Sequence, residues 1–400
     1  MNRRIVLNVT TSAEWCRHPV GIVRVERELT KAVFQYFGDA VIPVFLDRNT
    51  NQFKQIDQSC FHDLMSDKWI LSEDPTVDSL RVQRHLSQFA PTDRDRFVTV
   101  GSDWSWRIPD VVEQTYGTKR VMVAALYDLI PLMFPEFAPG SEFHEQFNYH
   151  YRALTRLAES IFSISETSAE TLRLFWRDRG LLEGAPPIHV VPLAAPVQAD
   201  TAGTLTEVDK AKLNDIQGEE DFVLYVSTIE PRKNHQLLLD VWRDLYSERG
   251  ENCPKLVLVG VKGWGSDDLV AAASKMNAFT AGKIVFESGI SDKLLVELYR
   301  RSLFSVFPSY FEGWGLAATE AASFGKVCLV SNTSALVEAT HGVMPSRHPL
   351  DFVGWKSEIE RLIDDKRYRS KLEAAISAGR FERDWKNFGQ EFCERILDLP

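Results

Sequence analysis

The sequence predicts an α/β protein with two domains, each built on a doubly wound parallel sheet. Three observations support this fold class. The chain has 400 residues, which is more than one compact core usually reaches. Short apolar runs of β-type composition alternate with segments of helical periodicity. The alternation starts a second time after residues 194–220, whose Pro, Gly, Thr and acidic content is typical of a linker between domains.

The expected elements follow this alternation in order. In the first half, strands are predicted at 5–9, 41–46, 97–100, 121–126, 161–164 and 188–191 and helices near 20–36, 142–158 and 168–179, while residues 47–95 are expected to be irregular. In the second half, strands are predicted at 222–226, 256–259, 283–286, 303–307 and 327–330, with helices that start near residues 234, 267, 292, 316 and 350. Ligands of such sheets bind beyond the carboxyl ends of the strands, so the loops that follow these strands are the expected site.

Composition indicates a globular enzyme and excludes several other classes. Apolar residues make up 44% and charged residues 26% of the chain, which is enough to fill two cores. The net charge of −10 argues against a general nucleic-acid binder, because phosphate contacts need a basic face. The five scattered cysteines favour reduced thiols in a cytosolic protein. The apolar run at the N-terminus is too short for a signal segment, and no apolar stretch approaches the ~18 residues of a membrane span.

The strongest functional signal lies in residues 309–320. Glu312 precedes a Gly-x-Gly turn, and Glu320 follows eight residues later inside the next predicted helix. Gly313 and Gly315 allow the backbone to approach a ligand closely, and the helix that follows offers free N–H groups and a positive dipole end to a diphosphate. The two carboxylates can accept hydrogen bonds from hydroxyl groups on either side. This pattern predicts a site for a sugar nucleotide.

A second candidate element follows the strand predicted at 222–226. It presents Arg232 and Lys233 at the start of a helix. An arginine can bind two phosphate oxygens at once, and a lysine supplies a compact charge. When a glycosyl–diphosphate bond breaks, negative charge grows on the leaving group, so fixed cations there stabilise the transition state more than the ground state.

These two segments together resemble the donor site of retaining GT-B glycosyltransferases of family 4, which include many bacterial mannosyltransferases. The matching patterns are Pro-Ser-x-x-Glu-Gly-x-Gly-Leu, Glu-Ala-x-x-x-Gly, Ser-Asn-x-Ser-Ala and an Arg-Lys-Asn motif in which Ser227 stands where many relatives have Gly. The resemblance implies that Arg232 and Lys233 contact the donor diphosphate. It also implies that Glu312 binds the sugar hydroxyls near the anomeric centre and that Glu320 binds the ribose.

The same resemblance implies the GT-B architecture of two Rossmann-like domains with the ligand between them. Residues 381–396 have apolar residues at helical spacing and resemble the closing helix of the family, which crosses back to the N-terminal domain. The expected domains are therefore an acceptor domain, residues 1–200 with 381–400, and a donor domain, residues 201–380.

Further donor contacts are implied in both halves. Residues 256–265 look like the glycine-rich loop that flanks the nucleotide, and residues 288–292 resemble the segment that clasps the nucleobase. Residues 17–29 resemble the mobile opening loop of the family, although only one of its usual glycines is present. The donor-binding residues that the resemblance implies are Gly21, Ser227, Gly260, Ile290, Gly313, Trp314, Gly315, Leu316 and Glu320. Gly260, Gly263 and Gly289 of these two segments are equally well interpreted as plain turn glycines.

Residues 123–136 match the family's His-Asp-Leu-Ile-Pro segment with one departure. Tyr127 stands where many members place a histidine, so any contact with the donor sugar falls to its hydroxyl. Asp128 is retained and is expected at a strand end that faces the ligand, as a catalytic candidate. A helix or turn cap is the alternative interpretation of Asp128.

Metal catalysis is not expected. Asp93 and Asp95 have the Asp-x-Asp spacing of GT-A enzymes, but they precede a predicted strand when a metal motif should follow one, so a surface turn is the better interpretation. The histidines show no zinc-binding spacing. We therefore expect no cofactor and no metal, with a nucleoside diphosphate sugar as co-substrate.

The resemblance to family 4 implies a metal-independent retaining hexosyltransferase that takes part in surface polysaccharide or lipopolysaccharide synthesis. GDP-mannose is the favoured donor, and the acceptor is expected to be a saccharide or a lipid-linked glycan. A cytoplasmic location is expected, with possible peripheral contact at the inner face of the membrane and no nucleic-acid partner. The alternatives are a GT-B sugar-nucleotide epimerase and a non-catalytic GT-B scaffold that binds a partner glycosyltransferase.

Overall fold

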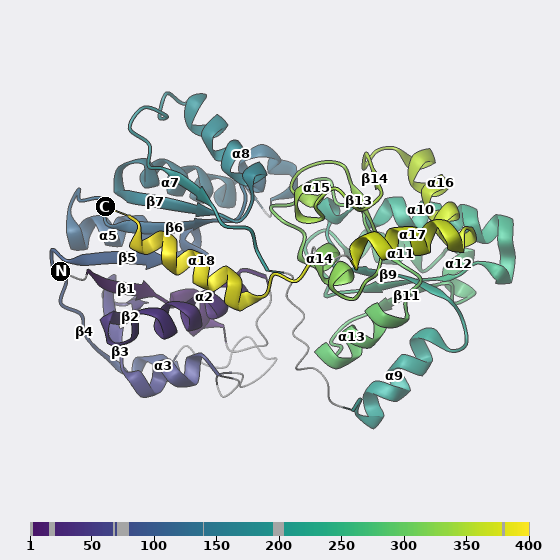
Figure 1. Cartoon of the computed structure of the whole chain (residues 1–400), viewed down its shortest axis with the longest axis horizontal. Coiled ribbons are helices and arrows are strands. Elements are labelled where there is room, and N and C mark those ends of the chain that lie inside the picture. The colour runs from purple at the N-terminus through teal and green to yellow at the C-terminus, as the bar shows by residue number, and fades with distance from the viewer. Residues whose placement is uncertain are drawn as a thin grey trace. The chain divides into compact units, whose positions relative to one another are not determined.

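The computed structural model describes residues 3–15, 21–66, 69, 80–138, 140–194, 204–377 and 381–399. The chain divides into two compact units (Figure 1). Unit 1 comprises Met1–Leu193 and Trp385–Pro400, and unit 2 comprises Ala194–Asp384. The boundaries expected from the sequence were at residues 200 and 381.

Unit 1 is built on a sheet whose eight described strands have the order β4-β3-β2-β1-β5-β6-β7-β8. The strands are β1 (Arg4–Asn8), β2 (Val41–Asp47), β3 (Gln52–Ile56), β4 (Leu86–Gln88), β5 (Asp95–Thr99), β6 (Met122–Leu126), β7 (Ala158–Ser163) and β8 (Ile188–Val190). The six strands expected from the sequence are confirmed and pair in parallel. This is the doubly wound arrangement that the alternation of strands and helices predicts.

One expectation about this unit was wrong. Part of the region expected to be irregular, residues 47–95, forms β3 and β4, which pair antiparallel with β2 and with each other. Both strands carry polar residues on a partly exposed surface, so they lack the continuous apolar run that marks the buried parallel strands. A polar strand at the margin of a sheet gives a weak sequence signal for that reason.

Helices connect the strands of unit 1. They are α1 (Thr10–Glu14), α2 (Gly21–Phe37), η1 (Gly38–Ala40), α3 (Gln58–Leu64), α4 (Leu80–Gln83), η3 (Asp103–Trp106), α5 (Ile108–Tyr116), α6 (Ile130–Met133), η4 (Pro135–Phe137), α7 (Ser141–Leu157) and α8 (Glu166–Arg177). The three helices expected in this half correspond to α2, α7 and α8, whereas α1, α3, α4, α5 and α6 were not predicted.

The last helix, α18 (Trp385–Leu397), belongs to unit 1 although it follows unit 2 in the chain. It packs against α2, and a Cβ added at Gly389 would lie 2.3 Å from the Cβ of Ala32, so a glycine is needed for this approach. The ring centroids of Phe392 and Phe162 lie 4.8 Å apart, which ties the same helix to the sheet. The expected helix that returns to the N-terminal domain is confirmed.

Unit 2 has a sheet of six described strands in the order β11-β10-β9-β12-β13-β14, all parallel. The strands are β9 (Phe222–Val226), β10 (Lys255–Val259), β11 (Ile284–Glu287), β12 (Ser305–Phe307), β13 (Cys328–Ser331) and β14 (Ser346–Arg347). The first five are the strands that the sequence predicts. Large aromatic side chains, among them Trp242 and Trp355, are fully buried beside this sheet.

The helices of unit 2 cover its sheet. They are α9 (Glu207–Gln217), η6 (Pro231–Lys233), α10 (His235–Arg249), η7 (Gly250–Asn252), α11 (Asp267–Ala273), α12 (Asn277–Thr280), α13 (Asp292–Arg301), α14 (Leu316–Ser323), α15 (Leu336–Ala339), α16 (Phe352–Asp364) and α17 (Lys366–Ile376). The expected linker at 194–220 is wrong in part, because it contains α9. A capping box of Thr206 and Asp209 starts this helix.

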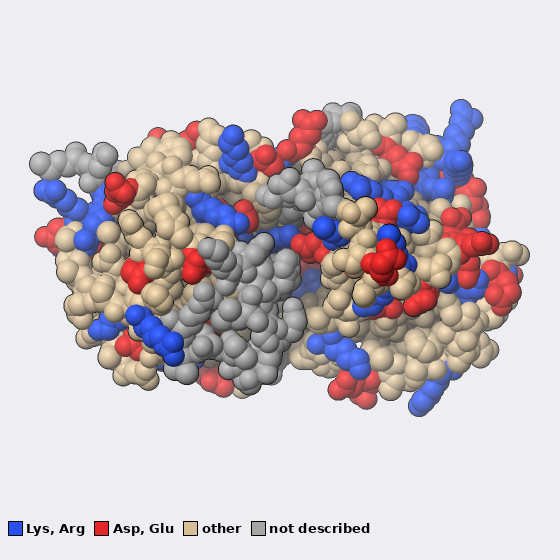
Figure 2. Space-filling model, turned by 90° about the horizontal axis from the view of Figure 1, so that it is seen from below, with Lys and Arg blue, Asp and Glu red and all other residues tan. Residues whose placement is uncertain are grey.

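Acidic and basic side chains are intermixed on the face of the molecule shown in Figure 2. Ion pairs near the surface of the protein include Arg249 with Asp364 at 2.7 Å and Lys356 with Glu248 at 2.5 Å. Pairs of this kind contribute little to stability. Within the described residues, no helix is both long and apolar enough to cross a bilayer.

Candidate functional site

The candidate site of unit 2 starts at the carboxyl end of β9. The short helix η6 carries Arg232 and Lys233, and Asn234 follows in the left-handed conformation with a φ of 55°. Asparagine tolerates this conformation better than most residues. The Asn234 amide is buried and donates to the carbonyl oxygens of Pro308 (3.2 Å) and Pro349 (2.9 Å). Asn234 therefore fixes the path of the backbone directly after Arg232 and Lys233.

Two hydrogen bonds to backbone carbonyl oxygens hold the Arg232 segment against the loop after β12. The N–H of Tyr310 donates to the carbonyl oxygen of Arg232 at 3.0 Å. In return, Nη1 of Arg232 donates to the carbonyl oxygen of Phe311 at 2.7 Å. The two sequence motifs, which lie about 80 residues apart in the chain, thus form one structural element.

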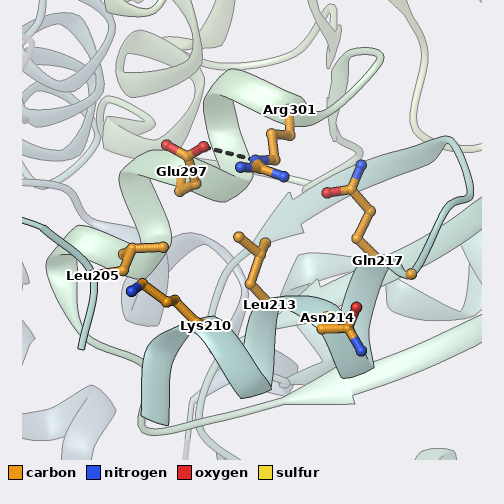
Figure 3. A pocket seen from close by; sticks show the side chains of 8 residues that line it. Leu205, Lys210, Leu213, Asn214, Gln217, Glu297 and Arg301 are labelled. Carbon is orange, nitrogen blue, oxygen red and sulfur yellow. Dashed lines mark hydrogen bonds and ion pairs between the residues drawn. The ribbon is translucent and has the colours of Figure 1, made fainter. Parts of the chain in front are cut away.

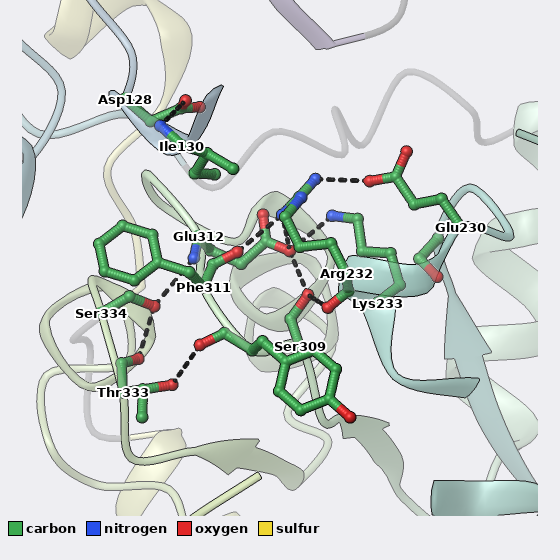
Figure 4. Close-up of polar contacts among 12 residues, drawn as sticks. Asp128, Ile130, Glu230, Arg232, Lys233, Ser309, Phe311, Glu312, Thr333 and Ser334 are labelled. Atoms are coloured by element: carbon green, nitrogen blue, oxygen red, sulfur yellow. Dashed lines mark hydrogen bonds and ion pairs between the residues drawn. The ribbon is translucent and has the colours of Figure 1, made fainter. Parts of the chain in front are cut away.

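The side chains of this element converge on Glu312 (Figure 4). Its Oε1 lies 2.6 Å from Nζ of Lys233 and 2.7 Å from Nη1 of Arg232, and it accepts a 2.5 Å hydrogen bond from the Ser309 hydroxyl. Nη2 of Arg232 also contacts Oε1 of Glu230 at 2.8 Å. Two cations and two carboxylates are therefore gathered at one place, and their formal charges cancel.

Burial and the neighbouring cations have opposite effects on the pKa of Glu312. Burial alone would raise the pKa of Glu312, but the cations of Arg232 and Lys233 overcome it and lower the pKa to about 2. Burial and the neighbouring Arg232 lower the pKa of Lys233. Glu312 is thus ionised at neutral pH. Its contribution to folding stability is complete above the unfolded pKa of 4.5 and is lost as the pH falls toward 2.

The turn after β13 supports Glu312 from the other side. The hydroxyl of Ser334 accepts a hydrogen bond from the N–H of Glu312 at 2.9 Å, and Ser334 itself has a φ of 60°. Thr333 donates from its hydroxyl to the carbonyl oxygen of Tyr310 at 2.9 Å. This turn is the Ser-Asn-x-Ser-Ala segment noted in the sequence, and its positioning role was not predicted.

Helix α14 begins directly after the glycine turn of the motif. Gly315 has a φ of 106°, and a Cβ at this position would lie 2.4 Å from Cδ2 of Leu336, so only glycine fits. Leu316 is the first residue of the helix, and Trp314 is buried. Gly313 lies between Trp314 and Glu312 in the same turn. The expected glycine turn at a helix start is therefore present, in a positive-φ conformation that a residue with a Cβ would rarely adopt.

Glu320 lies further along α14 and is also buried. Its Oε2 accepts a hydrogen bond from the Tyr299 hydroxyl of α13 at 3.0 Å. Burial together with this carboxylate holds the pKa of Tyr299 well above its usual value, so the phenol stays protonated and can donate. One carboxylate oxygen of Glu320 therefore already accepts a hydrogen bond from a side chain of unit 2. The expected contact of Glu320 with a ribose stays a prediction.

The loops after β9 and β10 meet closely. A Cβ at Gly260 would come within 1.9 Å of the carbonyl oxygen of Ser227, which makes a glycine necessary for close approach rather than for a turn. The Ser227 hydroxyl lies 3.3 Å from Nε2 of His235. Ile290 is partly buried against the core of unit 2. The contacts of these residues with a nucleotide stay predictions.

Three of the sequence candidates belong to unit 1. Gly21 starts α2 with a φ of 51°. Tyr127 is only 5% exposed, and its hydroxyl donates to the carbonyl oxygen of Val100 at 2.5 Å, so the group expected to replace a histidine already has a backbone partner. Oδ1 of Asp128 accepts from the N–H of Ile130 at 3.0 Å, at the start of α6. This contact matches the alternative interpretation of Asp128 as a cap.

The Asp-x-Asp pair lies elsewhere in unit 1. Asp95 is the first residue of β5 and is buried, with its Oδ1 2.7 Å from Nε of Arg4, so for Asp95 the expected surface turn was wrong. Asp93 is exposed and pairs with Lys119. No group of three or more His, Cys, Asp or Glu side chains suited to a metal occurs among the described residues.

Unit 2 also contains a cavity of ≈ 540 Å³ outside the candidate site (Figure 3). Its lining includes Leu213, Asn214 and Gln217 of α9 and the ion pair of Glu297 with Arg301 on α13. These segments precede β9 and β12, so the cavity lies toward the amino ends of the strands. The cations near Glu312 follow the carboxyl ends of the same strands.

Two buried acids in unit 1 were missed by the sequence analysis. Glu26 of α2 is fully buried, accepts from the N–H of Ser12 with one oxygen, and finds no hydrogen-bond partner for the other within the described part of the chain. A Cβ at Gly101 would lie 2.3 Å from that second oxygen. Asp103 accepts from Thr99 at 2.6 Å. Burial raises the pKa of Glu26 to about 8 and that of Asp103 to about 7.

These raised pKa values make the stability of unit 1 depend on pH. Both acids hold a proton in the folded state at a pH where the unfolded chain has lost it, so the free energy of unfolding should fall as the pH rises from 3.8, the unfolded pKa of Asp103, to about 8, the folded pKa of Glu26. Each pKa unit corresponds to about 1.4 kcal/mol. The Glu26→Gln variant should show a smaller fall in urea unfolding experiments across this range. Equal pH slopes for wild type and Glu26→Gln would contradict this expectation, and Glu28→Gln on the same helix is the control.

Comparison with known proteins shows what the sequence is similar to. Residues 208–343 match the family model of glycosyl transferases group 1. The serotype-specific mannosyltransferase WbdA of Escherichia coli is 24% identical over 66% of this chain and 32% of its own length. The O-antigen chain mannosyltransferase B of Escherichia coli is 30% identical over 42% of this chain and 43% of its own length. The chain thus spans about a third of WbdA.

Solved structures agree on the fold. Anabaena HepE in complex with UDP and glucose has a TM-score of 0.65 at 16% identity and covers 100% of both chains. Trehalose-6-phosphate synthase OtsA has a TM-score of 0.66 at 10% identity and covers 99% of both chains. The chain has the GT-B fold, and its resemblance to mannosyltransferase-like GT-B glycosyltransferases is confirmed, whereas membership of family 4 and a retaining mechanism stay predictions. More particularly, it is similar to two proteins that are named mannosyltransferases, and the part that matches the glycosyl transferases group 1 model lies within its second unit.

Proposed function

We propose that the chain is a retaining glycosyltransferase that moves a hexose from a nucleoside diphosphate sugar to a saccharide acceptor. The observation that carries the proposal is the buried contact of Arg232 and Lys233 with Glu312, beside the glycine turn that starts α14. Cations at a strand end and free N–H groups at a helix start suit a diphosphate. The ionised Glu312 suits the hydroxyl groups of a sugar.

The arrangement also suggests how the bond to the leaving group is weakened. As the glycosyl–oxygen bond breaks, negative charge moves onto the diphosphate. Arg232 and Lys233 lie in a partly dehydrated site where their charges act more strongly than in water. Their positions are fixed beforehand by Asn234 and by the backbone of residues 310–311, so little reorganisation is needed at the moment of reaction. Leaving-group stabilisation by these side chains is the role that we propose in place of a metal ion.

Mannose carried by GDP is the proposed donor. Its support is the similarity to two proteins that are named mannosyltransferases, together with the glycine-rich loop at Gly260. The names of the same proteins, which refer to serotype and O-antigen, support a surface polysaccharide as the acceptor.

Binding of GDP tests the donor site directly. We expect GDP to raise the melting temperature of the full chain in the presence of EDTA, because the proposed site holds the diphosphate with side chains alone. A ligand at 100 times its dissociation constant adds about 2.7 kcal/mol of stability. UDP and dTDP serve as the comparison. If none of the three diphosphates shifts the melting temperature, or if EDTA abolishes the shift, the proposed site is wrong.

A further inference from the structure

Helix α9 of unit 2 holds segment 288–291, which follows β11 in the chain. Nζ of Lys212 donates to the carbonyl oxygen of Ser288 at 3.0 Å. Oδ1 of Asp209 accepts a hydrogen bond from the Ser291 hydroxyl at 2.8 Å. Asp209 and Lys212 are three residues apart on α9, so both side chains leave the same face of the helix. The two ends of the segment are therefore each bonded to a side chain of this one helix.

Segment 288–291 is also joined to a neighbouring strand and to α13. The N–H of Gly260, directly after β10, donates to the carbonyl oxygen of Glu287 at 2.8 Å. Glu287 is the last residue of β11, and its Oε2 lies 3.5 Å from Nζ of Lys212. The Ser291 hydroxyl accepts a hydrogen bond from the backbone of α13 at 3.1 Å and so caps that helix. The path of the segment is thus fixed from three sides.

The middle of this segment offers backbone donors to a ligand. Gly289 has a φ of 59°, a conformation that glycine adopts readily. The N–H groups of Gly289 and Ile290 form no hydrogen bond with another residue that the structure describes. Nucleobases carry oxygen and nitrogen acceptors on their edges, such as O6 and N7 of guanine. Two backbone donors in a segment with fixed ends can therefore meet the edge of a base.

Segment 288–291 lies on the same edge of the sheet as the candidate donor site. In the strand order β11-β10-β9-β12, β11 is two strands away from β9, which Arg232 and Lys233 follow. Neighbouring strands are about 4.8 Å apart, so the ends of β9 and β11 are separated by roughly 10 Å. Glu320, the carboxylate predicted to bind the ribose, bonds to Tyr299 of α13, and α13 starts directly after the segment. A nucleoside that extends from the diphosphate past Glu320 is thus directed toward this segment.

We propose that Asp209 and Lys212 are positioning residues, which hold segment 288–291 in place for contact with the nucleobase of the donor. The inference rests on the proposed function, since it needs a nucleoside diphosphate bound at Arg232 and Lys233. Both residues of α9 act through the segment and not on the bond that breaks. Their loss should therefore weaken binding of the substrate and of the transition state alike, which raises the KM for the donor and leaves kcat unchanged.

Lys212→Met tests this role by calorimetric titration of the full chain. Methionine has nearly the same helix propensity as lysine, and the Lys212 side chain is 33% exposed, so the variant should fold. We expect the dissociation constant of GDP to rise about fivefold, because a segment that is not held beforehand must be ordered on binding. The affinity for inorganic pyrophosphate, which has no base, should stay the same. Without nucleotide, amide hydrogen exchange of residues 288–295 should become faster in the variant.

Lys210→Met is the matched control, because Lys210 lies on the same helix and forms an exposed pair with Glu207 at 2.7 Å. It should bind GDP as wild type does. The inference is overturned if Lys212→Met binds GDP as well as wild type, if its affinity for pyrophosphate falls by the same factor as its affinity for GDP, or if hydrogen exchange of residues 288–295 does not change. If wild type itself binds no GDP, the proposed donor site is wrong and this inference falls with it. GDP binding that Lys212→Met leaves intact overturns this inference alone.

Discussion

Replacing Lys233 or Arg232 by alanine should lower turnover by on the order of 100-fold or more, the usual effect of removing one donor that stabilises transition-state charge. Both side chains contact Glu312, so each single variant leaves that carboxylate with one remaining cation. The buried charge therefore keeps a partner, and the variants should fold. The measurement is the rate of hexose transfer from the nucleotide sugar, together with the unfolding transition of each variant.

Arg243→Ala provides the control for this experiment. Arg243 lies on α10, the helix that Asn234 introduces, but it forms an exposed pair with Asp240 at 2.6 Å. It should keep normal turnover. Turnover close to wild type in both Lys233→Ala and Arg232→Ala would place the diphosphate elsewhere. Donor consumption that needs no acceptor would favour the epimerase alternative.

The two glutamates of the motif should respond differently to the same substitution. Glu312→Gln should reduce transfer strongly, yet GDP should bind at least as well as to wild type. The reason is electrostatic, because Glu312 neutralises part of the charge of Arg232 and Lys233, and its removal leaves more positive charge for the diphosphate. Glu320→Gln should weaken GDP binding by roughly 1.5 to 3 kcal/mol, the value of a hydrogen bond to a charged acceptor.

Calorimetric titration of both variants with GDP measures this difference. Tyr299→Phe is a useful companion, since it removes the hydroxyl that Glu320 accepts from while the carboxylate stays in place. If Glu312→Gln loses affinity for GDP and Glu320→Gln keeps it, the assignment of sugar and ribose to the two carboxylates must be reversed.

The parallel strands of both units could be predicted because each is a short apolar run buried on both faces. The strand at Phe222–Val226 is an example in which four of five residues are fully enclosed. Polar strands such as Gln52–Ile56 carry no such run, and α9 has a composition close to that of a linker. In these cases tertiary pairing or a cap decides the structure, and local composition does not show it.

At the candidate site the sequence identified the chemical groups but not what holds them. Arg232, Lys233 and Glu312 were predicted from motifs about 80 residues apart, and the structure brings them into contact. The support from Asn234 and Ser334 depends on side chains that bond to distant backbone, a contact that no local spacing reveals.

The contact of Gly389 with Ala32 has a consequence for how this protein is made. The helix that covers α2 follows the whole of Ala194–Asp384 in the chain. At roughly 5 to 20 residues per second, a ribosome delivers that helix about 10 to 40 seconds after unit 1 has otherwise emerged. During this interval the part of α2 that packs against α18 has no partner, because unit 2 is still being synthesised. The first unit to be synthesised is thus the last to be finished, and the nascent chain carries an uncovered helix that a chaperone can recognise.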